Sequence, residues 1–346
     1  MNKQASQLAA IIAGALASSV VLSAPLQPIP KESGVGGSVI AGVTGAKFSS
    51  NMIAGPDGDL GTKTVTSLNG EPDSETNVSP TFSGEINYTF ADSRTQVFLG
   101  TSLEDLVRYD LAFQLGVRQE LKDKGIVYGA FLFSAIPTEV YADPYVTNTA
   151  RPETDRDSAG ARLGWQDILG SNFGVEISHR EIELDDENSG DDLVSQSLIT
   201  AQEQRLLSRE GDHNSIKFSY KMKVADGHLL VPELNFHDFD LDGGAMARSR
   251  YGVNLAHFWT TPKFSLITTI FYSHAEHDEL NPVYSNVTSE EEVDSIGASI
   301  VGTYNNIFDV ENLSAVASVA AGEADSTIDF YDADIVTGTV GVLYRF

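Results

Sequence analysis

The end of the chain, residues 335–346, alternates between apolar and polar side chains. Its apolar face carries Val336, Val340, Val342, Tyr344 and Phe346. Its other face carries Thr337, Thr339, Gly341 and Arg345, with Leu343 as the exception. A period of two is the pattern of a β-strand, because successive side chains point to opposite faces. The same alternation recurs along most of the sequence, so we expect a sheet with one apolar and one polar face.

The first residues predict a secretory signal peptide. Lys3 precedes an apolar run from Leu8 to Leu22, which is followed at Ser23-Ala24-Pro25 by the small residues of a cleavage site. We place the signal peptide at residues 1–23 and the mature protein at 24–346, with cleavage after Ala24 as the alternative. The apolar run is shorter than the roughly 20 residues of a spanning helix. Since no later stretch is longer, any membrane span must consist of strands.

Fourteen strands are predicted, separated alternately by long polar loops and tight turns. They cover residues 37–48, 81–90, 95–101, 110–118, 126–136, 157–169, 173–180, 216–223, 230–237, 250–259, 264–275, 295–304, 313–322 and 335–346. The first long loop spans residues 49–80. Pro232 lacks a backbone N–H, so we expect a bulge or a break in the ladder there.

Several features resemble bacterial outer-membrane barrels. Gly341, Tyr344 and Phe346 have the spacings of the barrel assembly signal. Large rings gather at the turn ends of several predicted strands, as in an interfacial girdle. These girdle residues are Phe90, Trp165, Trp259 and Tyr304.

Along its whole mature length the chain resembles Gram-negative outer-membrane β-barrel proteins of the general porin type, with families of unassigned function included. The resemblance implies an all-β, transmembrane, antiparallel up-and-down barrel of about 14 strands, with short periplasmic turns and long acidic extracellular loops. It also implies outer-membrane lipid, lipopolysaccharide and the barrel-assembly machinery as partners. Trimeric porins usually have more strands, so we expect a monomer.

The net charge is -27, from 49 acidic and 22 basic residues, and there is no cysteine. This balance argues against nucleic acid as a partner, because phosphate binding needs clustered lysine and arginine. Most of the acidic excess falls in the predicted extracellular loops. Those loops are either simply solvated or attract divalent cations such as Ca²⁺ or Mg²⁺ and lipopolysaccharide.

Charged residues on the polar faces should line the barrel interior, because a charge facing mid-depth lipid costs about 2–4 kcal/mol. The expected basic lining is Arg162, Arg180, Lys217, Lys221 and Arg250. The expected acidic lining is Glu85, Glu176 and Glu233. Together they either make a wet channel that steers anions or an ion-pair ladder that closes a narrow lumen.

Residues 238–243 resemble the opening of a calcium loop. Ser249 stands where the acidic ligand at the twelfth position is needed, which excludes a calcium helix–loop–helix. A looser rim site on Asp238, Asp240 and Asp242 stays open, as does an Asp-rich turn. The rim histidines His237, His274 and His277 match no catalytic motif, so we expect no enzyme and no cofactor beyond a rim cation.

Residues 191–209 are predicted either to form a short helix at the barrel mouth or to be a mobile outer loop. The leading functional hypothesis is a porin-like channel for passive diffusion of small polar or anionic solutes. The alternative is a structural or surface-interaction barrel whose acidic loops bind divalent cations, lipopolysaccharide or a partner. A barrel hydrolase is the third.

Overall fold

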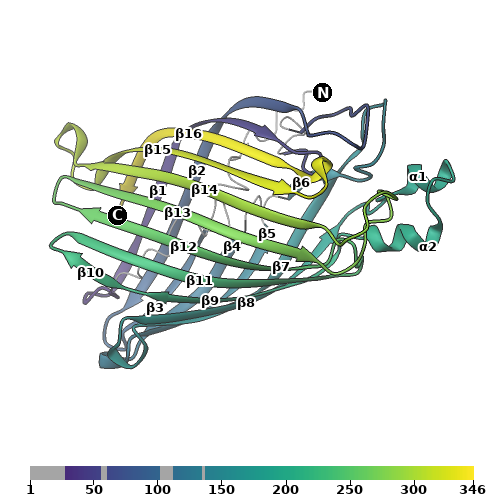
Figure 1. The fold of residues 1–346 in the computed structure, drawn as a ribbon. Helices are drawn as coiled ribbons and strands as arrows, with labels where there is room; N and C mark the ends of the chain where they lie inside the picture. Colours follow the sequence, from purple (N-terminus) through teal and green to yellow (C-terminus); the bar gives the residue numbers. More distant parts are fainter. Residues whose placement is uncertain (1–27, 56–60, 102–111, 135–136) are drawn as a thin grey trace, which may run out of the picture.

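The computed structural model describes residues 28–55, 61–101, 112–134 and 137–346 (Figure 1). The predicted signal peptide at 1–23 lies outside these residues. The described chain forms one antiparallel sheet that closes when β16 pairs with β1. Its strands are β1 (Gly34–Ser49), β2 (Ser74–Phe90), β3 (Thr95–Thr101), β4 (Ala112–Glu120), β5 (Ile126–Ser134), β6 (Thr138–Tyr141), β7 (Glu153–Gln166), β8 (Phe173–Leu184), β9 (Gly211–Tyr220), β10 (Met222–Ala225), β11 (His228–Leu241), β12 (Arg248–Thr260), β13 (Phe264–His277), β14 (Glu292–Asn305), β15 (Leu313–Ser326) and β16 (Ala333–Arg345).

The sixteen strands occupy fourteen positions around the ring. β6 follows β5 along β7, and β10 follows β9 along β11. The ladder on β11 is interrupted beside Pro232, between the pairs Glu233–Ser219 and Leu230–Met222, without a change of register. This is the expected ladder break, and its cause is the missing N–H of proline. The prediction of a 14-stranded antiparallel barrel is confirmed.

Alternation determines which side chains face outwards. Phe131, Leu163 and Val340 are 70%, 58% and 65% exposed, whereas the inner-face neighbours Leu132 and Arg162 are buried. Leu343, the exception in the final strand, is buried on the inner face. An apolar exterior around a closed sheet has no unpaired edge, so it suits a hydrocarbon environment.

Several strand ends differ from the sequence prediction. β2 begins at Ser74 instead of residue 81, because Ser74–Pro80 pairs with β1 although it carries no clear apolar alternation. β11 continues to Leu241, beyond the predicted end at residue 237. The strands therefore project past the apolar belt at the end where the long loops lie.

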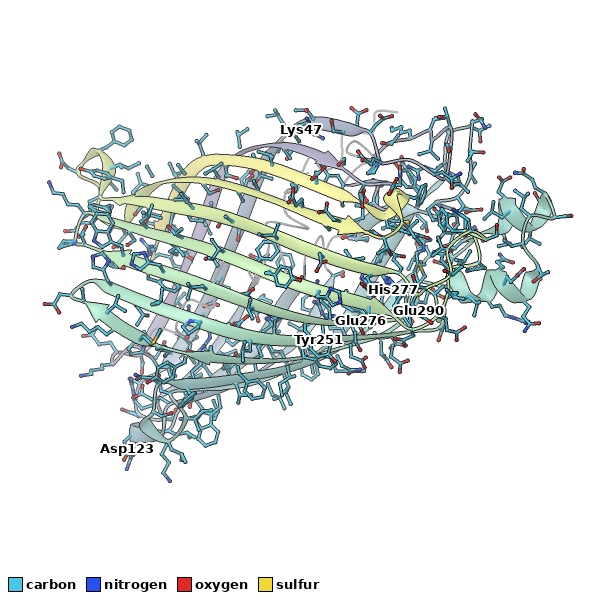
Figure 2. The ribbon with its side chains drawn as sticks, viewed as in Figure 1. Lys47, Asp123, Tyr251, Glu276, His277 and Glu290 are labelled. Atoms are coloured by element: carbon cyan, nitrogen blue, oxygen red, sulfur yellow. The ribbon has the colours of Figure 1, made fainter. Side chains whose placement is uncertain are left out.

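Long connections and short ones lie at opposite ends of the barrel. The long ones, residues 50–73, 142–152, 185–210 and 278–291, gather at one end, called here the cap end. At the other end, the turn end, the connections are short, for example 91–94, 121–125 and 226–227. Asp123 lies at the turn end, and Glu276, His277 and Glu290 at the cap end (Figure 2). Among the described residues, no helix is long and apolar enough to cross a membrane.

The C-terminal strand closes the barrel through a close approach of two glycines. Gly341 of β16 lies opposite Gly42 of β1. A Cβ atom on Gly341 would lie 2.5 Å from the carbonyl oxygen of Ala41 and 2.9 Å from the Cα of Gly42. The last residue is also held, because Phe346 N–H donates to Gly37 O at 3.1 Å and Gly37 N–H donates to Phe346 O at 3.0 Å.

Substitution of Gly341 by alanine should therefore weaken closure of the barrel. We expect a loss of about 1–3 kcal/mol in the free energy of unfolding, the usual cost of overpacking. It would be measured as a lower unfolding midpoint when gel migration is followed after heating. Gly338→Ala is the matched control on the same strand, because the nearest atom to its added Cβ is 3.9 Å away. Equal effects of the two substitutions would contradict this role of the glycine seam.

Candidate functional site

A buried cluster of basic residues occupies the inner faces of β7, β8 and β9. Arg162, Arg180 and Lys217 are 4%, 2% and 4% exposed. Glu176 lies between two of them, with its Oε1 3.3 Å from Arg162 Nε and 3.4 Å from Lys217 Nζ. The Tyr128 hydroxyl donates to Glu176 Oε2 at 2.5 Å. Strand register creates this group, since Glu176 pairs directly with Lys217.

The cluster continues onto β11 and β12. Glu233 is buried and accepts a hydrogen bond from Asn254 Nδ2 at 2.8 Å. Arg250 pairs in register with His237, whose ring nitrogen Nδ1 lies 3.0 Å from Nε2 of His213. Both histidines are buried and stack with Phe239. We call Arg162, Arg180, Lys217 and Arg250, with Glu176 and Glu233, the interior charge cluster.

Two sequence-predicted lining residues lie away from this cluster. Lys221 sits near the turn end, with Nζ 2.8 Å from Asp167 Oδ1. Glu85, on β2, pairs with Arg118 on β4, Nη2 to Oε2 at 2.5 Å, and Arg118 also lies over the Phe98 ring. Arg118 was identifiable from its place on the polar face of its strand.

Tyr128 was also absent from the sequence prediction, for a different reason. Residues 126–136 are apolar on both faces, so the alternation of polar and apolar residues does not predict which of their side chains point inwards. Its inward direction is set by pairing with Gly164 of β7, where a Cβ atom would lie 2.2 Å from the Tyr128 ring.

Charged residues are concentrated on one side of the inner wall of the barrel, and most of them are basic. On the inner faces of the described strands β7, β8, β9, β11 and β12 lie Arg156, Arg162, Arg180, Lys217, Arg248 and Arg250 against Glu176 and Glu233. The inner faces of β13 to β16 and β1 carry mostly small or apolar residues. A wall with excess positive charge attracts anions, most strongly where water is excluded.

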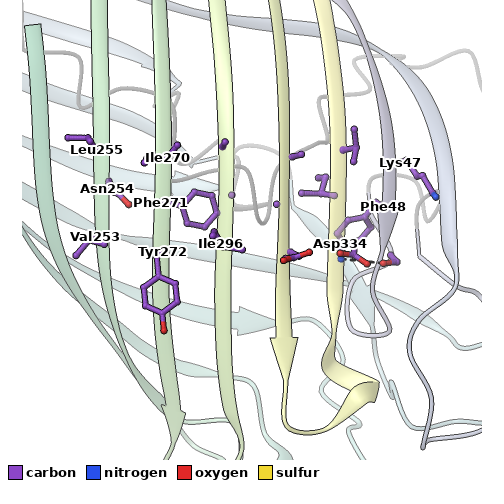
Figure 3. Close-up of a pocket in the computed structure, with 18 of the residues that line it drawn as sticks. Lys47, Phe48, Val253, Asn254, Leu255, Ile270, Phe271, Tyr272, Ile296 and Asp334 are labelled. Atoms are coloured by element: carbon purple, nitrogen blue, oxygen red, sulfur yellow. Dashed lines mark hydrogen bonds between the residues drawn. The ribbon is translucent and has the colours of Figure 1, made fainter.

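A cavity of about 1210 Å³ lies inside the barrel against this neutral wall. Phe48, Phe271 and Ile335 line it on β1, β13 and β16, and Glu233 and Asn254 line it where the charged wall begins. Figure 3 shows the rings of Phe48 and Phe271 among the lining side chains. Its volume exceeds the 300–1,000 Å³ typical of small-molecule pockets, so it has room for a small solute with water.

Six connections at the cap end meet in one hydrophobic core, called here the cap core. They are residues 50–73, 142–152, 185–210, 242–247, 278–291 and 327–332. The buried members are Val65, Tyr145, Leu193, Ile199, Leu207, Ala245, Met246, Tyr284, Ile328 and Phe330. Because these connections arise all around the ring, a core that they share must lie across the barrel mouth.

Hydrogen bonds link loops from nearly opposite sides of the barrel. The hydroxyls of Tyr145 and Tyr331 are 2.7 Å apart, and Asn281 Nδ2 donates to the Tyr331 hydroxyl at 2.7 Å. Asp143 accepts from the backbone N–H groups of Tyr145, Gly190 and Asp192, each at 3.0 Å. The described loops at this end therefore form a packed and hydrogen-bonded cap.

Residues 191–209 belong to this cap, which decides between the two sequence predictions. Helices α1 (Asp191–Ser195) and α2 (Ala201–Gln204) lie at the cap end (Figure 1). Thr200 caps α2 and forms a capping box with Glu203. Leu193 and Leu207 anchor the segment in the cap core. It is a structured lid element and not a free outer loop.

Two titratable groups are buried beneath the cap, above the apolar belt. Burial raises the pKa of Glu291 to about 7, although Ser326 Oγ donates to its Oε1 at 2.8 Å. Burial and the nearby charge of Arg248 lower the pKa of His277 to about 4. The backbone of His277 donates to Glu291 O at 2.9 Å, so the two residues are neighbours.

The sequence-predicted metal site is not brought together. The described residues contain no group of three or more His, Asp or Glu placed to hold a metal ion. The prediction of an Asp-rich turn is wrong for two of the three aspartates. Asp238 and Asp240 lie within β11, and only Asp242 follows the strand. The inward alternation of His237, Phe239 and Leu241 extends the strand by four residues.

Two of the rim histidines, His274 and His277, lie on different faces of β13. His274 lies on the outer face, with Nδ1 3.0 Å from Asp294 Oδ1. His277 is buried on the inner face, three residues later. The structure therefore places His274 and His277 on opposite faces of β13.

The predicted girdle residues lie at the turn ends of their strands. Tyr304 pairs with Phe264, whose ring lies 4.7 Å from that of Trp259. Trp165 Nε1 donates to Lys124 O at 2.8 Å, and Phe90 is exposed. Amphipathic rings near one level fit the interface between lipid and water.

A closed antiparallel barrel with an apolar exterior and a charged interior defines an integral bacterial outer-membrane β-barrel protein. The chain belongs to the DUF2860 family, described as proteins of unknown function, whose family model matches residues 34–345. No curated protein matches the sequence significantly.

Solved outer-membrane barrels are similar in fold. The CymD monoaromatic hydrocarbon channel has a TM-score of 0.44 and 10% identity, covering 96% of this chain and 94% of its own. A Pseudomonas aeruginosa FadL homologue has a TM-score of 0.41 and 9% identity, and the match covers 90% of this chain and 89% of the homologue. The channel DcaP of Acinetobacter baumannii has a TM-score of 0.40 and 10% identity, and the match covers 90% of this chain and 98% of DcaP. Such distant similarity does not identify a solute.

Proposed function

We propose that this protein is an outer-membrane channel for small polar or anionic solutes, closed at its outer mouth by the loop cap. The observation that carries the proposal is the interior charge cluster, which adjoins a cavity of about 1210 Å³ inside a closed barrel. Buried charges are costly to maintain. A barrel with only a mechanical role would be served by a neutral interior.

The ion-pair alternative explains only part of the cluster. Glu176 bridges Arg162 and Lys217, which supports a structural role for those three groups. However, the inner faces of the described strands β7, β8, β9, β11 and β12 carry more basic than acidic residues. A positive interior favours anions over cations.

The selectivity test uses a protein whose cap is opened by Leu207→Asp. Under a salt gradient in a planar bilayer, its reversal potential should indicate anion preference. Arg162→Gln/Lys217→Gln should move that potential toward zero, because it removes two positive charges from the inner wall. Lys221→Gln is the matched control, since Lys221 pairs with Asp167 at the turn end. Cation preference in the parent protein would contradict the proposal.

A surface-interaction barrel is the second candidate, and the cap itself favours it. A packed outer domain with a sealed core could present a recognition surface without any transport. Ion conductance distinguishes the two functions. A correctly folded, cap-opened barrel that passes no ion would favour the surface-interaction function.

A further inference from the structure

The cavity of about 1210 Å³ is bounded by a row of apolar and glycine residues that crosses neighbouring strands. The register runs from Phe271 through Gly297 and Gly322 to Ile335 and Phe48. A Cβ atom on Gly297 would lie 2.4 Å from Cε1 of Phe271, so the absence of that atom lets the ring lie along the wall. The rings of Phe271 and Phe48 both lie at the cavity (Figure 3), and the row offers an apolar surface to a molecule inside it.

A hydrogen-bond acceptor stands at one end of this row. Asn254 pairs in register with Phe271, so the two side chains are neighbours on the inner face. Asn254 Nδ2 donates to Glu233 Oε1 at 2.8 Å. Because this bond uses the nitrogen of the amide, Oδ1 is the end of the group that can accept a hydrogen bond from the cavity. An O–H group bound there would place the rest of its molecule against the Phe271 ring.

The charged groups at the cavity disfavour an ionic ligand of either sign. Among the described residues that line it, the charged ones are Lys47, Asp73, Glu233, Glu323 and Asp334. Lys47, Glu323 and Asp334 are exposed on the outer faces of their strands, and Asp73 belongs to the connection 50–73. Glu233 is therefore the charged side chain that the described strands direct toward the cavity.

An organic anion would meet the carboxylate of Glu233, with no base of the described inner faces in the lining to receive it. An organic cation would come near Lys217, which pairs with Asn235 and so lies diagonally beside Glu233. Either ion would also lose hydration on entering a partly apolar space. An uncharged molecule avoids all three costs.

Toward the turn end, the same wall continues in hydroxyl groups. Thr269 pairs with Ser299, one row below the apolar row on β13 and β14. Further round the ring, Thr339 pairs with Ser318 and with Thr44, and the hydroxyls of Thr339 and Thr44 are 2.7 Å apart. Hydroxyl groups both donate and accept hydrogen bonds, so this surface suits uncharged polar groups.

We infer that the cavity takes uncharged small molecules with an apolar body and a hydroxyl group, such as aromatic or short aliphatic alcohols, in preference to organic ions of the same shape. The hydroxyl would donate to Asn254 Oδ1, and the apolar body would lie against Phe271. The inference rests on the proposed channel function for a route into the barrel. Within the polar solutes proposed above, it names the class that the cavity holds.

The first test measures binding of benzyl alcohol, benzoate and benzylammonium to Leu207→Asp protein in detergent at pH 7, by saturation-transfer NMR. Micelles without protein give the background. Benzyl alcohol should bind about tenfold more tightly than either ion, although all three share one ring. Phe271→Ala should weaken its binding about tenfold through the lost ring contact. Phe131→Ala is the matched control, because the same change on a ring that is 70% exposed on the outer face should have no effect.

The second test concerns the hydroxyl group. Benzyl alcohol should bind about fivefold more tightly than benzyl methyl ether, which lacks the O–H donor, a difference equal to one ordinary hydrogen bond. Asn254→Leu should remove this preference. Asn235→Leu makes the same change on the neighbouring strand β11 at a residue outside the lining, so it should leave the preference as it is.

Binding of either ion as tight as that of benzyl alcohol would overturn the inference. Equal effects of Phe271→Ala and Phe131→Ala would overturn it too, because the alcohol would then be held on the outer surface. If Phe271→Ala is not recovered in folded form, Asn254→Leu decides, and an unchanged preference over the ether would contradict the assignment.

Conductance of the same Leu207→Asp protein separates this inference from the proposed function. Current through the barrel without binding of benzyl alcohol would remove the inference and leave the channel intact. Binding of benzyl alcohol without any current would remove the channel function and leave the cavity as a binding site.

Discussion

Replacement of Leu207 by aspartate is expected to convert a mostly closed barrel into a steadily conducting one. Leu207 is fully buried in the cap core, where loops from around the ring meet. Placing an unpaired carboxylate there costs several kcal/mol, so the cap should separate while the barrel below stays intact. The open fraction of single-channel recordings should rise at least tenfold, and residues 185–210 should become sensitive to protease.

Leu198→Asp provides the control on the same loop. Leu198 is 65% exposed, so the same change of charge there should leave both the open fraction and protease resistance near wild type. If protease shows that Leu207→Asp has loosened the cap and the open fraction does not change, the cap is not the gate. Equal opening by both variants would point to loop charge as the cause.

The second large effect concerns pH, and it becomes visible only when one of two opposing groups is removed. Glu291 is protonated more readily in the closed cap than in water, because burial raises its pKa to about 7. Its contribution to the closed state is full below its ordinary pKa of 4.5 and is lost as pH rises through about 7. His277 acts in the opposite direction. Its contribution is present above pH 6.5 and is lost as pH falls through about 4.

Each contribution is on the order of 3 kcal/mol, so the wild-type cap should show only a shallow pH dependence between pH 4 and 7. Glu291→Gln should make the cap acid-labile, and its opening constant should rise on the order of 100-fold between pH 6.5 and 4. His277→Gln should do the reverse and tighten the cap as pH falls from 7 to 4.5. The neighbouring groups are Arg248, Ser326, Asp332 and the hydroxyls of Tyr145, Tyr284 and Tyr331.

Hydrogen exchange of the 191–209 peptides, corrected for intrinsic rates, measures this opening. The two variants should give slopes of opposite sign against pH. Slopes of the same sign, or a steep dependence in the wild-type protein, would contradict the assignment of these two groups. The readout does not depend on whether the barrel conducts.

The barrel itself was predictable because its physical cause is local. Each spanning strand must present apolar side chains to lipid at every second position, and that period is visible in one sequence. Where lipid does not act on the strand, the signal is absent: Ser74–Pro80 is strand only because it pairs with β1. The same reasoning explains why Asp238 and Asp240 resembled a turn, since they lie on the part of β11 that projects beyond the apolar belt.

The cap and the pairing of charges could not be predicted in this way. Apolar residues of the cap core, such as Val65, Leu207 and Phe330, are scattered in polar loops without any period. Their meeting depends on the ring that brings their loops together. Alternation correctly placed Glu176 and Lys217 on polar faces, but only the register of β8 and β9 makes them partners. Lys221 has the same pattern, yet it lies near the turn end beside Asp167.

Swelling of proteoliposomes in an isosmotic solution of a small polar solute tests the central claim most directly, because it reports passage through the barrel without an applied voltage. Leu207→Asp protein should give rapid swelling, whereas wild-type and Leu198→Asp protein should swell slowly. Liposomes without protein should not swell. Absence of swelling with folded Leu207→Asp protein, whose cap is cleaved by protease, would show that the interior is not a path.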